Sequence, residues 1–184
     1  MKSFKLFGIM MLFASLVIMS CSKEDDKDKG TCFDGIQNQD ETGVDCGGVC
    51  TACLEGAQGK WKSYPVAPIL ANFADSIIAE FKTNNTYVVY QYKDGAKVDL
   101  TGTYTQTKSG TGNIYNIKLN QTAPTALVAE GIFEVAADKN SMKYEIIQTE
   151  PSLGVAAPTA AGGFGSSGGG AFGTINIQEY KRVK

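Results

Sequence analysis

The chain has 184 residues, of which 43% are hydrophobic, with 17 basic and 19 acidic side chains and no histidine. This length suits one sizeable domain, and the net charge of −2 argues against a nucleic-acid partner. The lack of histidine removes the most common general base and metal ligand.

The first 20 residues have the layout of a secretory signal peptide. Lys2 and Lys5 precede an apolar run over 7–19, which is shorter than the twenty or so residues of a membrane-spanning helix. The run ends in Ile18-Met19-Ser20-Cys21, which resembles the lipobox of bacterial lipoproteins. The resemblance implies cleavage before Cys21 and acylation of Cys21 by palmitate-type chains, which would anchor the protein to a membrane. The alternative is an ordinary secretory signal with an incidental cysteine.

Residues 21–31 are predicted to combine the lipidated Cys21 with an acidic tether. Positions 22–30 contain no large apolar side chain, so the segment cannot bury enough surface to order itself. Lys23-Glu24-Asp25 resembles the export signal of surface lipoproteins in one Gram-negative phylum, which implies the outer face of the outer membrane. A plain charged tether on the periplasmic face is the alternative.

A cysteine-rich spacer is expected over 32–55. Outside the cytoplasm its four cysteines predict two disulfides, with three pairings open. Cys50 and Cys53 lie so close in sequence that each is expected to pair with an earlier cysteine, either Cys32 or Cys46. Two metal sites compete with this interpretation. One is a zinc site of all four thiolates, and the other is a weak calcium site among the oxygens of Asp34, Asn38, Asp40, Glu41 and Asp45.

The spacer resembles a short module of secreted and surface proteins, Cys-x-Asp-Gly-x-Gln-Asn-x-x-Glu-Thr-x-x-Asp-Cys-Gly-Gly-x-Cys-x-x-Cys. The match covers 32–53, with Gln39 where that module usually has glycine. The resemblance implies a small disulfide-stapled spacer without an activity of its own. So short a segment could not fold without its cross-links.

Residues 56–184 alternate between apolar and polar side chains and carry frequent turn signals. Strands are expected over 59–64, 76–83, 86–93, 97–107, 113–121, 126–136, 142–149 and 173–182. Short connections such as Asp94-Gly95 favour consecutive hairpins. The prediction is an all-β, eight-stranded, antiparallel up-and-down barrel, with an open meander or sandwich as the alternative.

Two connections of this domain stand out. Residues 66–75 are expected to form one short helix that places Ile69, Leu70 and Phe73 over one end of the barrel. Residues 154–173 form a long glycine-rich loop. We expect a flexible loop there, or else a lid that inserts Phe164 and Phe172 into the barrel mouth.

The order Gly59-Lys60-Trp61, then Phe81-Lys82 with Thr86-Tyr87, then Gly102-Thr103-Tyr104 resembles the lipocalin-like domains of bacterial lipoproteins. The resemblance implies that Trp61 plugs one end of the barrel and that a basic residue from the last strand packs over it. Arg182 is the candidate, with a cation–π contact of about 0.5–2 kcal/mol.

No catalytic constellation, metal site or cofactor motif is expected, so the protein is predicted not to be an enzyme. The first function hypothesis is an anchored, monomeric lipoprotein whose barrel binds a small apolar ligand. Its pocket residues would be Tyr90, Tyr104, Tyr115 and Phe133. The alternative is a non-enzymatic structural or interaction module with a filled barrel, which presents loops to a surface partner or a glycan.

Overall fold

The computed structural model describes residues 32, 34–38 and 40–183, and the chain divides into two compact units between Cys53 and Leu54. The predicted signal peptide, Cys21 and the whole tether up to residue 31 lie outside the described residues. Within the described part, no helix has the length and apolar character needed to cross a membrane.

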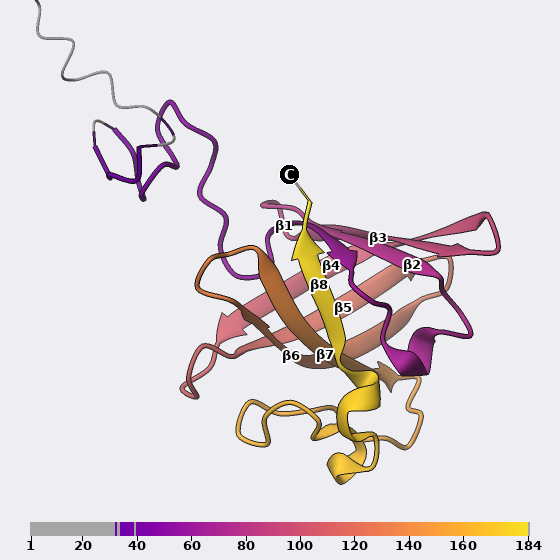
Figure 1. Cartoon of the computed structure of the whole chain (residues 1–184). Coiled ribbons are helices and arrows are strands. Elements are labelled where there is room, and N and C mark those ends of the chain that lie inside the picture. The colour runs from indigo at the N-terminus through magenta and orange to yellow at the C-terminus, as the bar shows by residue number, and fades with distance from the viewer. Residues whose placement is uncertain (1–31, 33, 39, 184) are drawn as a thin grey trace, which may run out of the picture. The chain divides into compact units, whose positions relative to one another are not determined.

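The second unit is a closed barrel of eight antiparallel strands, each paired with the next in sequence and the last with the first (Figure 1). The strands are β1 (Gly59–Ser63), β2 (Ser76–Phe81), β3 (Thr86–Lys93), β4 (Ala96–Lys108), β5 (Tyr115–Ala123), β6 (Leu127–Val135), β7 (Ser141–Glu150) and β8 (Gln178–Arg182). The predicted all-β, up-and-down barrel is therefore confirmed.

Successive side chains of each strand point alternately into the barrel and out to its outer surface. The inward set forms a single core with Trp61 and Phe133 fully buried. Gly131 lies among these inward positions, and a Cβ atom there would collide with the backbone oxygen of Glu145 on β7. Glycine thus lets β6 and β7 approach closely where the sheet coils.

The predicted capping helix over 66–75 is wrong. Only a single 3-10 turn, η2 (Pro68–Leu70), forms there. Leu70 packs against the core, whereas Phe73 is 64% exposed. Ten residues that begin after a proline are too few to make a stable helix without a buried apolar stripe, and this segment turns Phe73 outward instead.

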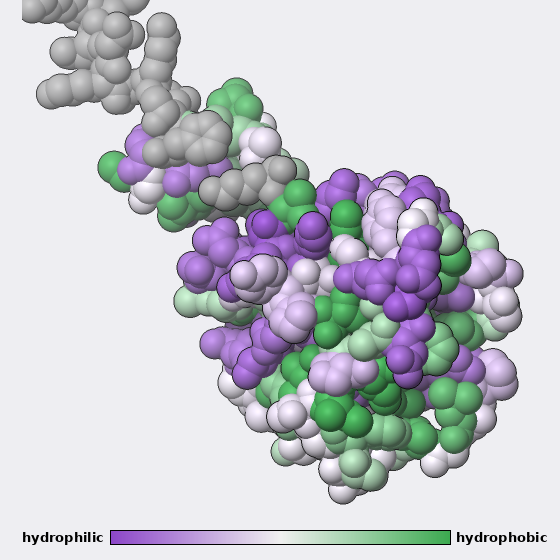
Figure 2. Space-filling view, turned by 45° about the vertical axis from the view of Figure 1, so that its right-hand side comes forward, coloured by the Kyte–Doolittle hydropathy of each residue, from purple (hydrophilic) through white to green (hydrophobic). Residues whose placement is uncertain are grey.

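The glycine-rich connection between β7 and β8 does not insert Phe164 into the barrel mouth, because the ammonium of Lys143, an exposed residue of β7, lies 5.9 Å from the centre of the Phe164 ring. It folds into two 3-10 turns, η3 (Ser167–Gly170) and η4 (Gly173–Asn176), below the barrel in Figure 1. The expected last strand consequently begins at Gln178 and not at residue 173. The lower part of the surface in Figure 2, where this connection lies, is mostly apolar or neutral in colour.

The first unit is held by two disulfides, Cys32–Cys50 and Cys46–Cys53. The prediction that Cys50 and Cys53 each pair with an earlier cysteine is confirmed. An isolated bridge joins Gly43 and Cys46, and Asp45 accepts hydrogen bonds from the backbone N–H groups of Asp34 and Gly35. Cross-links and turn bonds thus take the place of a hydrophobic core.

Candidate functional site

Aromatic rings fill the middle of the barrel. Phe81 lies at the centre of this cluster, with the ring of Tyr104 edge-on at 5.1 Å and the rings of Tyr87 and Tyr144 each at 6.2 Å. Tyr180 meets Tyr144 edge-on at 5.9 Å. All five side chains are at most 5% exposed. Such ring pairs add stability beyond the area they bury, so this space is occupied by the protein itself.

The residues predicted to line an apolar pocket lie in three different places. Tyr104 belongs to the central cluster, and its hydroxyl donates to the backbone oxygen of Lys82 at 2.9 Å. Tyr115 and Phe133 stack on each other with ring centroids 5.0 Å apart. Tyr90 is on the outer wall, where the Lys97 ammonium lies 4.8 Å from its ring centre.

The position of Tyr90 follows from strand periodicity. Tyr87 faces the core and lies three residues away on β3, so the two side chains point to opposite faces. The structure therefore does not bring Tyr90 together with the other three predicted pocket residues.

One end of the barrel is closed by Trp61 and Arg182, which are paired across β1 and β8. The Arg182 guanidinium carbon lies 4.0 Å from the indole centre, so the predicted cation–π contact is confirmed. Trp61 Nε1 donates to the backbone oxygen of Ala57 at 2.7 Å. A Cβ atom at Gly59 would collide with the guanidinium. The close approach of the guanidinium therefore explains why residue 59, two positions before Trp61, is a glycine.

Backbone carbonyls hold the arginine in place. Its Nη1 donates to Gln58 at 3.1 Å and its Nε donates to Lys139 at 2.6 Å. Partial burial lowers the pKa of Arg182, although a guanidinium stays charged in proteins. The side chain therefore links β8 to two connections that are distant in sequence.

A hollow of about 670 Å³ opens at the same end of the barrel. Leu54, Tyr115 and Val135 give it an apolar part, and Gln106, Lys108 and Arg182 are among its polar groups. The Gln106 amide accepts from Ala57 and donates to Glu55, which fixes residues 55–57 beside the hollow. Of the four predicted pocket residues, Tyr115 alone lines this hollow.

A groove of about 320 Å³ lies on the outer wall of the barrel. Its floor belongs to β4, β5 and β6, and its side is residues 157–159 of the glycine-rich connection. The lining residues are Thr105, Thr107, Asn116, Ile117, Lys118, Glu130, Gly131, Ala157, Pro158 and Thr159. Lys118 and Glu130 form an ion pair of 2.8 Å in it.

Glu145 fixes the glycine-rich connection to the barrel. It is fully buried and pairs with Ile132 across β6 and β7 on the outward face. Its carboxylate accepts the backbone N–H groups of Gly165 at 2.6 Å and Ser167 at 3.1 Å, and the Ser167 hydroxyl at 2.5 Å. Asn176 completes the network by donating to the Ser167 oxygen and to Ile146. Such charge-assisted bonds are the strong ones among protein hydrogen bonds.

Sequence reasoning missed this role of Glu145. The available signal was an acidic residue at an outward position of a strand whose next connection is rich in glycine. Backbone N–H groups of a glycine-rich turn can converge on an anion. Here the anion is a side chain of the same protein.

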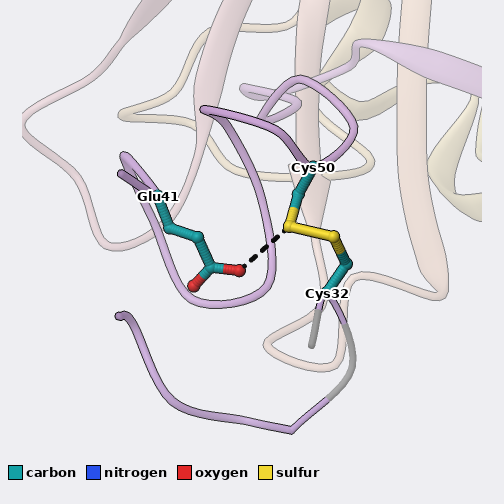
Figure 3. Close-up of side chains that lie close together, drawn as sticks. All are labelled: Cys32, Glu41 and Cys50. Carbon is teal, nitrogen blue, oxygen red and sulfur yellow. Dashed lines mark hydrogen bonds between the residues drawn. A yellow bond between two sulfur atoms is a disulfide. The ribbon is translucent and has the colours of Figure 1, made fainter. Parts of the chain in front are cut away.

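The cysteine-rich unit brings Cys32, Glu41 and Cys50 together (Figure 3). The two sulfur atoms are bonded to each other, so they are not the thiolates that bind zinc. Glu41 Oε1 lies 3.1 Å from the Cys50 sulfur, which has no proton to donate, so we interpret the approach as a close oxygen–sulfur contact. All four cysteines of the alternative zinc site are in disulfides.

Three of the four acidic side chains of the alternative calcium site accept hydrogen bonds from nearby backbone N–H groups. Asp34 accepts from Ile36, Glu41 accepts from Asn38, and Asp45 accepts from Gly35. Carboxylates used in this way fix turns. The observed bonds thus give these acids a structural role.

Comparison of the chain with protein-family models, curated proteins and solved structures gives no match.

Proposed function

We propose that this protein is a membrane-anchored, non-catalytic interaction module of a bacterial cell envelope. Lipid on Cys21 would hold it at the outer membrane, facing the cell surface. The barrel would act as a rigid scaffold that presents its outer wall and connections to a surface partner. The packed aromatic interior carries the proposal, because three rings with centroids 5.1 to 6.2 Å from that of Phe81 occupy the space that a carried ligand would need.

The anchoring part of the proposal is supported by the cysteines. An apolar run ends at Cys21, and the other four cysteines form disulfides, which persist outside the reducing cytoplasm. Detergent phase partition after expression in a Gram-negative host tests the anchor. The full chain should enter the detergent phase and Cys21→Ala should stay in the aqueous phase. Equal partition of both would contradict lipid attachment.

Surface exposure needs a separate measurement. Protease added to intact cells should digest the wild-type protein, and replacement of Lys23, Glu24 and Asp25 by alanine should protect it. The triple variant keeps Cys21, so its total membrane-bound amount serves as the control. Protection of the wild-type protein would place it on the periplasmic face.

Native mass spectrometry of the lipoprotein, purified from the membrane in which it was made, tests the filled interior. We expect the mass of the acylated chain and no further bound mass after the detergent is removed. A retained apolar molecule would instead favour the carrier hypothesis, in which the barrel binds a small apolar ligand.

The hollow beside Tyr115 favours a second candidate function, the binding of a small apolar ligand at the barrel end. Its volume of about 670 Å³ lies in the range of small-molecule sites. If a retained mass is found, Val135→Asp should remove it, because a carboxylate on the apolar side of the hollow would repel an apolar molecule. Val98→Asp, at a 44% exposed position on β4 outside the hollow, is the matched control.

A further inference from the structure

Resting on the proposed function, we propose that the groove on the outer wall of β4, β5 and β6 binds a neutral, polyhydroxylated ligand, namely a sugar unit of a surface glycan. This assignment names the partner class and its site. It depends on the arrangement of side chains in the groove, the balance of their charges and the fixed position of residues 157–159.

The strand register places the polar side chains of the groove in two neighbouring rows. Thr105 pairs with Lys118, and Lys118 pairs with Glu130, so the first row crosses three strands. Thr107 pairs with Asn116 in the second row. Neighbouring strands lie about 4.8 Å apart, so the groove presents several hydrogen-bonding groups at a spacing that one ring-shaped molecule can reach.

These groups are available to a ligand. The side chains of Thr105, Thr107 and Asn116 make no hydrogen bond to any residue that the structure describes. Hydroxyl and amide groups can both donate and accept, which matches a sugar hydroxyl that does the same. Thr159, on the opposite side of the groove, accepts from Gly162 and keeps its hydroxyl proton for a further bond.

Charge in the groove favours a neutral ligand over an ion. The side chains of Lys118 and Glu130 are 45% and 42% exposed, and their charges neutralise each other. An anion would lie beside Glu130 and a cation beside Lys118, and each would meet one like charge. A neutral molecule can accept from the ammonium and donate to the carboxylate at the same time.

The side wall of the groove is fixed before any ligand binds. The half-buried Ala157 offers apolar surface against which the carbon face of a sugar can pack, and Pro158 beside it is buried. Their position depends on the segment that follows, in which Gly168 donates to the backbone oxygen of Ala156 and Glu145 binds Gly165 and Ser167. A wall held in this way lowers the ordering cost of binding.

The test is binding of the full-length lipoprotein, in detergent micelles, to an array of neutral oligosaccharides of glucose, mannose, galactose and N-acetylglucosamine, with heparin as the anionic comparison. We expect at least one neutral oligosaccharide to bind. Asn116→Ala and Thr107→Ala should each raise its dissociation constant about tenfold, the effect of one lost hydrogen bond to a well-placed group.

Thr103→Ala is the matched control, because Thr103 is an exposed threonine on the same strand and lies outside the groove. It should leave the dissociation constant unchanged. Emission of the buried Trp61 reports whether each variant is folded.

Three results would overturn the inference. They are no binding of any neutral oligosaccharide, equal loss with Thr103→Ala, and tighter binding of heparin that increases with Glu130→Gln. Either of the first two would show that the groove is not a sugar site. The proposed function as an interaction module would still stand, because native mass spectrometry tests it separately. The third would assign the groove to an anionic ligand.

Discussion

At the scale of single residues, the contact between Trp61 and Arg182 is the best-defined contributor to stability. Arg182→Ala removes the cation–π contact and two hydrogen bonds to carbonyl groups. We expect the free energy of unfolding to fall by about 2 kcal/mol. Urea unfolding followed by the emission of Trp61, the single tryptophan of the chain, measures the change.

Lys181→Ala provides the control for that measurement, because Lys181 is exposed and precedes Arg182 on β8. Its effect should stay within about 0.5 kcal/mol of the wild type. If both variants unfold at the same urea concentration, the contact over Trp61 contributes nothing to stability.

The pairing of Trp61 with Arg182 could be predicted from the sequence because each is the only residue of its type and the family resemblance names the contact. The outward position of Tyr90 could also have been obtained, by counting three residues from Tyr87 along one strand. The role of Glu145 was not assigned, because the glycine-rich composition of the next connection does not show which backbone N–H groups, here those of Gly165 and Ser167, meet the carboxylate.

At the scale of elements, the strands were predictable and one connection was not. Alternation locates a strand with a half-polar face, and β3 (Thr86–Lys93) matches the expected range at both ends. The glycine-rich connection has no periodic pattern, so composition alone suggested a flexible loop. Its path is set by tertiary hydrogen bonds to β7, chiefly those that Glu145 accepts from Gly165 and Ser167.

We therefore expect Glu145→Gln to loosen the glycine-rich connection while the barrel persists. The amide replaces one acceptor oxygen by a donor, which leaves an N–H group of Gly165 or Ser167 without an acceptor. The cost should be about 2 kcal/mol of stability. Hydrogen exchange at residues 163–168 should accelerate in the variant.

Glu134→Gln is the control for Glu145→Gln. Glu134 is a half-buried acid on β6, and its side chain makes no hydrogen bond among the described residues. Exchange at residues 163–168 should match the wild type in this control. Unchanged exchange in Glu145→Gln as well would show that the carboxylate does not hold the connection.

At the scale of the whole molecule, covalent and non-covalent stabilisation are divided between the two units. All described cysteines are in the first unit, and Leu54–Lys184 contains none. Reduction should thus unfold the cysteine-rich unit, which spans 22 residues from its first cysteine to its last, both included, and depends on its cross-links. The thermal midpoint of the barrel should not move.

Differential scanning calorimetry with and without a phosphine reductant follows the barrel, and hydrogen exchange at residues 40–53 follows the first unit. Peptide mapping without reduction checks the pairing of Cys32 with Cys50 and of Cys46 with Cys53. A barrel midpoint that falls on reduction would contradict the independence of the two units.

The buried tyrosines make the barrel sensitive to alkali. Burial raises the pKa of Tyr87 to about 12 and raises the pKa of Tyr144 well above its usual value, and it raises the pKa values of Tyr104 and Tyr180 as well. An unfolded tyrosine ionises near pH 10 or so. Above that pH the unfolded chain has released protons that the folded barrel retains, so the free energy of unfolding must fall as the pH rises.

Tyrosinate absorbance and circular dichroism, recorded together during an alkaline titration, check this expectation. The last four of the eight tyrosines should ionise in the same transition in which the sheet signal is lost, because their ionisation requires the barrel to open. In guanidinium chloride they should ionise with the rest. Tyr87→Phe removes one group with a raised pKa and keeps the ring beside Phe81, so its alkaline unfolding should occur at higher pH. Ionisation of all eight tyrosines before any loss of the sheet signal would mean that solvent reaches the barrel interior, which would return the carrier hypothesis to first place.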